Sequence, residues 1–374
     1  MKSLPDGMCL GLWVWRQQMC EPEIRIQRDN SERNDMQTRK LGTLEVSSIG
    51  MGCMGFTHGY GACPDEKESI RLIRKAFDLG CTFFDTAEIY SAYGNELLVG
   101  KALNPIRDKV VLSSKVHPAI LPGQNFPEGK MSRRGIFSAL DGSLRRLQTD
   151  HLDLYYVHRV PEATDVEELA HVFGELIQDG KILGWGVSEA TVEQIRKANA
   201  VTPLTAVQSE YSMMARQWEK DVIPLCAELG IGFVAYSPMA SGFLSGKYTV
   251  DTEYKGDDVR RVITRFSKKN VMANQPLLDL LFKYAAEKHA TPAQISLAWL
   301  MHRGDFIVPI PGMRRDERIK ENLGAADVIL TDEEFARLET ELDKIIIHGD
   351  RKDEDIAKLG TIAICQENNT GTHL

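Results

Sequence analysis

The sequence lacks any hydrophobic run that could cross a membrane, and it lacks a cysteine pattern typical of disulfides or metal sites. Its seven cysteines are an odd number and are scattered without paired spacing. No apolar stretch approaches the roughly 18 residues of a membrane span. The short apolar run at 8–15 has no small-residue cleavage site of the kind that ends a signal peptide. We therefore expect a cytoplasmic protein with no bound metal and no membrane partner.

An excess of basic residues is absent too. Lysine and arginine number 45 against 53 aspartate and glutamate, so the net charge at pH 7 is −8. A nucleic-acid partner normally requires a basic face, and we expect none here. With 43% hydrophobic and 26% charged residues, the composition is that of an ordinary globular protein.

The chain divides into three parts by its hydrophobic pattern. Residues 1–35 show no hydrophobic period, and we expect them to be a poorly ordered extension. The compact pattern runs over 36–346, and an irregular tail follows at 347–374. Two further irregular segments, 116–131 and 237–272, are long enough to cover a binding site.

Within 36–346, short apolar runs alternate with amphipathic stretches of helix length. Residues 40–46 predict a hairpin that turns at Gly42-Thr43, and the helix predicted over 68–79 ends at Gly80. Capping boxes at Thr191, Thr291 and Thr331 predict three more helix starts. Predicted strands near residues 49, 82, 111, 154, 184, 206, 233 and 308 make eight. Eight strands alternating with helices predict an α/β fold, the parallel (β/α)8 TIM barrel, preceded by the hairpin.

Six of the apolar runs end in a polar residue that can do chemistry or bind a ligand. These residues are Asp85, Lys115, His158, Ser188, Gln208 and Tyr236. In a parallel β/α barrel the carboxyl ends of the strands open on one face, where the active site is built. The sequence therefore predicts an enzyme with its site at this face.

The glycines at 50–55 spell the dinucleotide-binding fingerprint G-x-G-x-x-G. That motif works only where the third glycine opens a helix, whose N-terminus then binds the pyrophosphate. Here Gly55 is followed by an irregular segment with a proline at position 64. We interpret the glycines as a strand-to-loop turn, which argues against a Rossmann dehydrogenase.

Tyr90 lies five residues after Asp85 and could complete a proton-donating group with Lys115 and His158. Reduction of a carbonyl places negative charge on its oxygen, which then needs a proton donor within about 3 Å. A tyrosine hydroxyl keeps its proton at neutral pH, and a neighbouring ammonium group lowers its pKa. A buried lysine needs a carboxylate partner to stay charged, and an imidazole can orient the carbonyl oxygen. Each residue alone has an ordinary structural explanation, whereas the combination favours carbonyl chemistry.

These residues lie in motifs that resemble the aldo-keto reductase family. The motifs are the segments 84–90 (FDTAEIY), 94–96 (GNE), 114–115 (SK) and 153–158 (DLYYVH), and the resemblance covers about residues 37–345. It implies that Tyr90 is the general acid, that Lys115 and Asp85 tune it, and that His158 orients the carbonyl.

The resemblance also implies a nicotinamide site. Ser188 and Gln208 would hydrogen-bond the carboxamide, and the ring of Tyr236 would stack on the pyridine. Glu189 stands where many family members carry asparagine, and the resemblance places it at the same carboxamide, as a weaker match than Ser188. As an alternative, Gln208 could be a buried amide that pairs with the backbone. Ser237 begins a loop of small residues that would suit the pyrophosphate.

Residues 309–322 run from a strand end through a glycine turn into a helix and carry several arginines. Such a segment suits a phosphate, because backbone N–H groups and guanidinium groups converge on it. The resemblance implies NADPH as the cofactor. Its adenosine phosphate and adenine would contact Gly312, Arg314, Arg318, Glu321 and Asn322. Arg315 and Lys320 are interpreted as solvated helix charges.

The leading hypothesis is an NADPH-dependent reductase that converts an aldehyde or ketone, a small-molecule carbonyl substrate, to the alcohol. The alternative is an NADP(H)-binding regulatory subunit of the potassium-channel β-subunit type, because such subunits share both the fold and the four residues. The irregular loops would set substrate choice, and the sequence does not name the substrate.

Overall fold

The computed structural model describes residues 36–120, 125–161, 164–352 and 355–356. The predicted extension at 1–35 and most of the predicted tail at 347–374 lie outside these ranges. Among the described residues, no helix is long and apolar enough to cross a membrane. The cysteines at 53, 63, 81 and 226 are free thiols.

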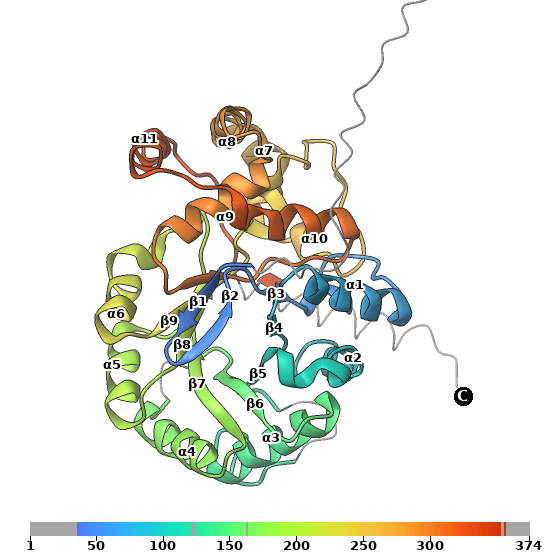
Figure 1. Cartoon of the computed structure of the whole chain (residues 1–374), viewed down its shortest axis with the longest axis vertical. Coiled ribbons are helices and arrows are strands. Elements are labelled where there is room, and N and C mark those ends of the chain that lie inside the picture. The colour runs from blue at the N-terminus through green and yellow to red at the C-terminus, as the bar shows by residue number, and fades with distance from the viewer. Residues whose placement is uncertain (1–35, 121–124, 162–163, 353–354, 357–374) are drawn as a thin grey trace, which may run out of the picture. The chain divides into compact units, whose positions relative to one another are not determined.

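Eight parallel strands form one sheet in which each strand pairs with the next along the chain. They are β3 (Met51–Gly52), β4 (Phe83–Asp85), β5 (Val111–Val116), β6 (Leu152–Val157), β7 (Ile182–Ser188), β8 (Ala206–Glu210), β9 (Gly232–Tyr236) and β10 (Ile307–Pro309). The sheet curls so that its first and last strands meet (Figure 1), with a parallel bridge between Gly52 and Gly312. The Gly50 N–H also donates to the Pro309 carbonyl at 3.0 Å. The predicted barrel is thus confirmed.

Helices surround the sheet on its outer side (Figure 1). Those of the β/α repeat are α1 (Glu66–Asp78), α2 (Gly94–Leu103), α3 (Arg133–Leu147), α4 (Val166–Gln178), α5 (Val192–Val201), α6 (Val222–Leu229), α9 (Pro292–His302) and α10 (Asp316–Leu323). Three more are α7 (Lys268–Ala273), α8 (Gln275–Glu287) and α11 (Asp332–Leu342). The capping boxes predicted at Thr191, Thr291 and Thr331 form and start α5, α9 and α11.

The predicted hairpin closes the amino end of the barrel. Its strands are β1 (Thr38–Leu41) and β2 (Leu44–Ser47), and the turn at 42–43 uses a left-handed Gly42 with φ of 55°. Leu41 and Val46 are fully buried in a cluster with side chains from inside the barrel. Leu41 lies against Gly232, the first residue of β9, so closely that a β-carbon there would approach within 2.4 Å. The hairpin therefore seals the face opposite the strands' carboxyl ends.

The glycine fingerprint opens no helix, as predicted. Residues 54–56 form one short 3-10 turn, and α1 begins only at Glu66, after Asp65 caps its first turn. The predicted loop at 237–272 contains three 3-10 turns, at Ala240–Ser245, Val259–Arg261 and Thr264–Phe266, and its end at 268–272 is helical, because α7 begins at Lys268. The described part of the tail contacts this region, because the Asp350 N–H donates to the Thr264 hydroxyl at 2.8 Å.

Candidate active site

A buried lysine and a buried aspartate meet at the carboxyl ends of adjacent strands. Lys115, fully buried in β5, donates to Oδ1 of Asp85 and to the Thr86 carbonyl at 2.7 Å. The other carboxylate oxygen, Oδ2, accepts from the Ser113 hydroxyl at 2.7 Å and from the Gln208 amide at 3.0 Å. Both oxygens of this buried carboxylate are therefore paired, which keeps the charge tolerable in the interior.

Tyr90 lies above this pair in the segment that follows β4. The Lys115 ammonium is 5.2 Å from the centre of its ring, and the rings of His58 and His158 lie at 5.4 and 5.9 Å. Burial raises the pKa of the Tyr90 hydroxyl, while Lys115 acts in the opposite direction. The sequence led us to expect a lowered pKa, and the net direction is the reverse because desolvation outweighs the ammonium. Tyr90 therefore holds its proton at neutral pH.

Lys115 stays charged although it is buried. Burial alone lowers the pKa of its ammonium group, but Asp85 and Tyr90 outweigh that effect and the pKa lies above its usual value. The site thus keeps a positive charge beside the tyrosine ring, where it stabilises a tyrosinate.

His158, directly after β6, is a neutral imidazole. Burial, together with the positive charges of Lys115 and Arg159, holds its pKa well below the usual value. Its Nδ1 atom is buried and has no hydrogen-bond partner among the described residues. The ring of His117 meets it edge-on at 5.3 Å and is also neutral, because burial and nearby cations lower its pKa to about 4. We did not predict a role for His117, although it follows Lys115 by two residues at the same strand end.

The residues predicted to contact nicotinamide lie at the next strand ends around the barrel. Ser188 and Gln208 are buried register partners on β7 and β8. Tyr236 ends β9, and its hydroxyl accepts from Arg159 at 2.9 Å. The guanidinium groups of Arg159 and Arg351 lie 5.0 and 5.3 Å from the centre of its ring. The described part of the tail thus reaches the predicted nicotinamide site.

Left-handed residues mark three of these strand ends. Arg159, Glu189 and Ser237 follow β6, β7 and β9 with φ of 67°, 54° and 48°. Such conformations cost energy in non-glycine residues and cluster at functional sites. The Glu189 carboxylate is engaged within the protein, since Oε1 lies 3.3 Å from the Arg159 guanidinium and accepts from the Glu210 N–H at 2.8 Å.

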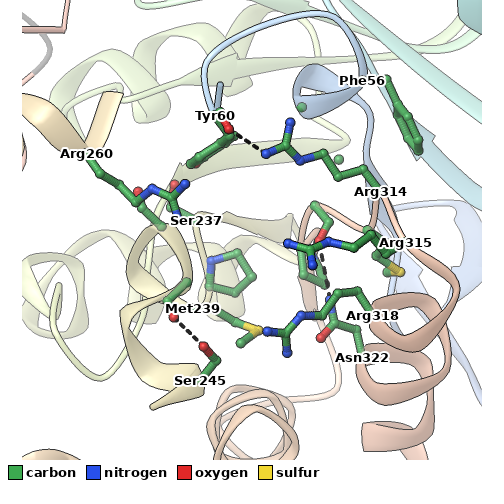
Figure 2. Close-up of a pocket in the computed structure, with 18 of the residues that line it drawn as sticks. Phe56, Tyr60, Ser237, Met239, Ser245, Arg260, Arg314, Arg315, Arg318 and Asn322 are labelled. Carbon is green, nitrogen blue, oxygen red and sulfur yellow. Dashed lines mark hydrogen bonds between the residues drawn. The ribbon is translucent and has the colours of Figure 1, made fainter. Parts of the chain in front are cut away.

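A pocket opens beside these residues, between the 3-10 turn at 54–56 and the start of α10 (Figure 2). Four arginines line it: Arg260, Arg314, Arg315 and Arg318. Of the other predicted contacts, Ser237, Gly312 and Asn322 also line it. Figure 2 shows three of the arginines on one side and Arg260 with Ser237 on the other. A ligand that fills this pocket meets guanidinium groups on both sides.

One further feature of the pocket suits a nucleotide ligand. The Asn322 side chain donates to the Gly312 carbonyl at 3.4 Å, and its Oδ1 atom is buried without a partner among the described residues. Guanidinium groups match phosphate oxygens, and an unpaired amide oxygen suits an N–H donor such as that of a purine.

The predicted phosphate residues differ in what they contact. Arg314 donates to the carbonyls of Tyr60 and Ala62, the latter at 3.0 Å, and so holds the loop before α1. Arg318 forms an ion pair with Glu321, and Glu321 itself does not line the pocket.

Two arginines that were not predicted to contact the cofactor also line the pocket. Arg315, interpreted from sequence as a solvated helix charge, is exposed but lines the pocket, because it precedes α10 where the chain turns inward. Arg260 was missed altogether. Its side chain is buried, it bonds Asp258, and its guanidinium lies 4.5 Å from the centre of the Tyr248 ring.

An eight-stranded β/α barrel with reactive side chains and an arginine-lined pocket at the carboxyl ends of its strands is the architecture of a barrel enzyme. Comparison with known proteins narrows this class. The family model of the aldo/keto reductase family matches residues 48–343. The chain is 39% identical over 308 residues to "Probable aldo-keto reductase 1" of Glycine max, covering 81% of this chain and 88% of the relative.

Solved structures agree with that match. The glycerol dehydrogenase of Gluconobacter oxydans superposes with a TM-score of 0.74 at 26% identity, over 83% of this chain and 96% of the other. An aldo/keto reductase of Klebsiella pneumoniae, solved with NADP and acetate, gives 0.64 at 28% identity over 82% and 95%. The chain belongs to the aldo/keto reductase family, whose members are NADP-dependent oxidoreductases that act on carbonyl and alcohol groups.

Proposed function

We propose that this chain reduces an aldehyde or ketone to the corresponding alcohol with NADPH as the cofactor and Tyr90 as the proton donor. The observation that carries the proposal is the protonated Tyr90 placed between a charged Lys115 and a neutral His158. When bound, NADPH supplies a hydride to the carbonyl carbon. The protein's own groups must then place a proton on the carbonyl oxygen.

Each of the four residues has one part in that transfer. His158, as a neutral imidazole, donates a hydrogen bond that orients the carbonyl oxygen toward the Tyr90 hydroxyl. Tyr90 gives up its proton as negative charge develops on the oxygen. The Lys115 ammonium stabilises the resulting tyrosinate, and Asp85 keeps that ammonium charged and in place.

The chemistry of the pocket supports NADPH as the ligand. Arg318 and Arg315 would hold the adenosine phosphate, Asn322 would meet the adenine, and Arg260 would face the pyrophosphate from the opposite wall. Ser188, Gln208 and Tyr236 would hold the nicotinamide next to Tyr90. Glu189 is a weaker candidate, because its carboxylate already pairs with Arg159.

The test compares the wild-type protein with Tyr90→Phe, using NADPH oxidation at 340 nm against a series of aldehydes, ketones and sugars. A general acid contributes about 10²–10⁴-fold, so we expect kcat to fall by at least about 100-fold in the variant. NADPH affinity should stay within about twofold, since Tyr90 is assigned to the proton and not to the cofactor. Equal turnover in the variant would overturn the acid role. Tight NADPH binding without turnover of any carbonyl would favour the regulatory-subunit alternative.

A further inference from the structure

A second buried ion pair lies next to the four proposed site residues. The Nζ atom of Lys130 is 2.7 Å from Oε1 of Glu88, and both side chains are 0% exposed. Burying two charges costs desolvation energy that their attraction only partly returns, and apolar replacements are often as stable. Stability alone therefore does not account for this pair.

The pair joins three segments of the chain. Glu88 lies two residues before Tyr90 in the connection from β4 to α2. Its Oε1 atom also accepts from the backbone N–H of His117 at 2.8 Å, just beyond the end of β5 that carries Lys115. Lys130 lies two residues before Ser132, which caps the start of α3. One carboxylate thus ties the Tyr90 segment both to the end of β5 and to the start of α3.

The Tyr90 segment needs such an anchor because its backbone is strained. Ser91, Ala92 and Tyr93 are three consecutive left-handed residues with φ of 51°, 44° and 79°. Left-handed conformations are costly for residues other than glycine and persist only where the surroundings hold them. One of the segment's own turn bonds, from the Tyr93 N–H to the Glu88 carbonyl at 3.0 Å, is made to the anchored residue.

We propose that the Glu88–Lys130 ion pair fixes the positions of Tyr90 and His158 relative to each other, as proton donation requires. Glu88 acts on Tyr90 through the short segment between them. It acts on His158 through His117, whose ring meets that of His158 at 5.3 Å, while His158 in turn meets Tyr90 at 5.9 Å. This assignment rests on the proposed reductase function. Neither residue touches the reacting atoms, so both are positioning residues.

The test begins with Lys130→Met, which keeps the length of the side chain and removes its charge. The matched control is Lys181→Met, which breaks the partly exposed pair with Asp141 on the outside of the barrel. Hydrogen–deuterium exchange of the cofactor-free proteins should show peptides covering 86–93 exchanging at least about tenfold faster in Lys130→Met alone. In turnover assays, kcat should fall about 10–100-fold with an unchanged KM for NADPH, because a misplacement of about 1 Å can cost 10²-fold.

Two further variants separate positioning from simple stability. Lys130→Arg keeps the charge and should retain kcat within a few-fold of the wild type. Lys130→Met leaves the Glu88 carboxylate buried without its partner, and the double variant Glu88→Gln/Lys130→Met removes that charge. The thermal stability of the double variant should therefore recover, while its kcat stays low. The double variant serves as the test if the single variant does not fold.

Unchanged exchange in 86–93, or a folded double variant with wild-type kcat, overturns the proposal. The exchange measurement needs no turnover. A wild-type protein that reduces no carbonyl would therefore overturn the proposed function, while the anchoring of 86–93 could still be judged.

Discussion

The Gln208 side-chain amide donates a 3.0 Å hydrogen bond to Oδ2 of Asp85, the carboxylate that also binds Lys115. Because Nε2 faces Asp85, the Oε1 atom of Gln208 must point away from it. The proposed nicotinamide side and the proposed proton side of the site therefore share one buried carboxylate. A substitution at either residue should therefore affect both NADPH binding and proton donation.

Gln208→Met is the first test of that link. The substitution keeps the volume of the side chain but removes the donor to Asp85 and the acceptor on its other side. A hydrogen bond to a charged group contributes about 1.5–3 kcal/mol, so we expect NADPH affinity to fall about tenfold or more and kcat to fall with it. Ser209→Ala, on the next residue of β8, is the control, because its buried hydroxyl has no partner among the described residues. Fluorescence titration with NADPH measures the affinity, and an unchanged value for Gln208→Met would contradict the link.

Arg318→Ala should change the choice between NADPH and NADH. The substitution removes a guanidinium from the pocket and leaves the Glu321 carboxylate without its partner. We expect NADPH affinity to fall about 10–100-fold, the range for a lost charged hydrogen bond, and NADH affinity to stay within about twofold. Lys320→Ala, on the exposed side of α10, should leave both affinities as they are. Equal losses for the two nucleotides would show that Arg318 does not contact the 2′-phosphate.

His117 should make the fold sensitive to acid. Its pKa is about 4 in the folded protein, against about 6.5 when exposed in the unfolded chain. Between these values the unfolded chain binds a proton that the folded protein does not, so the free energy of unfolding falls as pH drops from about 6.5 to 4. His158 acts in the same direction. His117→Asn should therefore flatten, without abolishing, the decrease seen in urea unfolding across this range. A wild-type slope retained in His117→Asn would contradict this assignment.

Leu41→Ala should destabilise the whole barrel from its amino end. Leu41 is fully buried and packs with residues from inside the barrel. Truncation of a buried leucine costs about 2–5 kcal/mol. Chemical denaturation measures the loss, with Leu183→Ala as the control because Leu183 is 50% exposed on β7. Equal losses in the two variants would rule out a sealing role for the hairpin.

The elements of this fold were predictable because their signals are local. A capping box marks the start of a helix wherever the chain later goes, and Thr191, Thr291 and Thr331 all start the helices predicted for them. The position of Tyr90, five residues beyond a strand end, was equally readable. Lys115 lowers the pKa of Tyr90 as expected, but burial raises this pKa more, and the depth of burial cannot be inferred from the neighbouring residues in the sequence.

The contacts within the site were not predictable in the same way. Gln208 and Asp85 are 123 residues apart, and the local sequence around either residue does not indicate that the two form a hydrogen bond. Arg314 and Arg315 are adjacent in sequence and both line the pocket, yet only Arg314 also binds the carbonyls of the loop before α1 among the described contacts. Such outcomes depend on where a neighbouring loop places its carbonyl groups.

The sequence by itself determined the eight strands, several of the helices, and the side chains that stand at the strand ends. Hydrophobic periodicity and helix capping depend on residues that are close together in the sequence. These elements can therefore be predicted without a structure. Only the tertiary structure decided that Asp85 accepts hydrogen bonds from both Lys115 and Gln208. It also decided that Glu88 and Lys130 form an ion pair that is fully buried. Closure of the barrel brings distant strand ends within hydrogen-bond distance, and burial then sets which of their charges are kept.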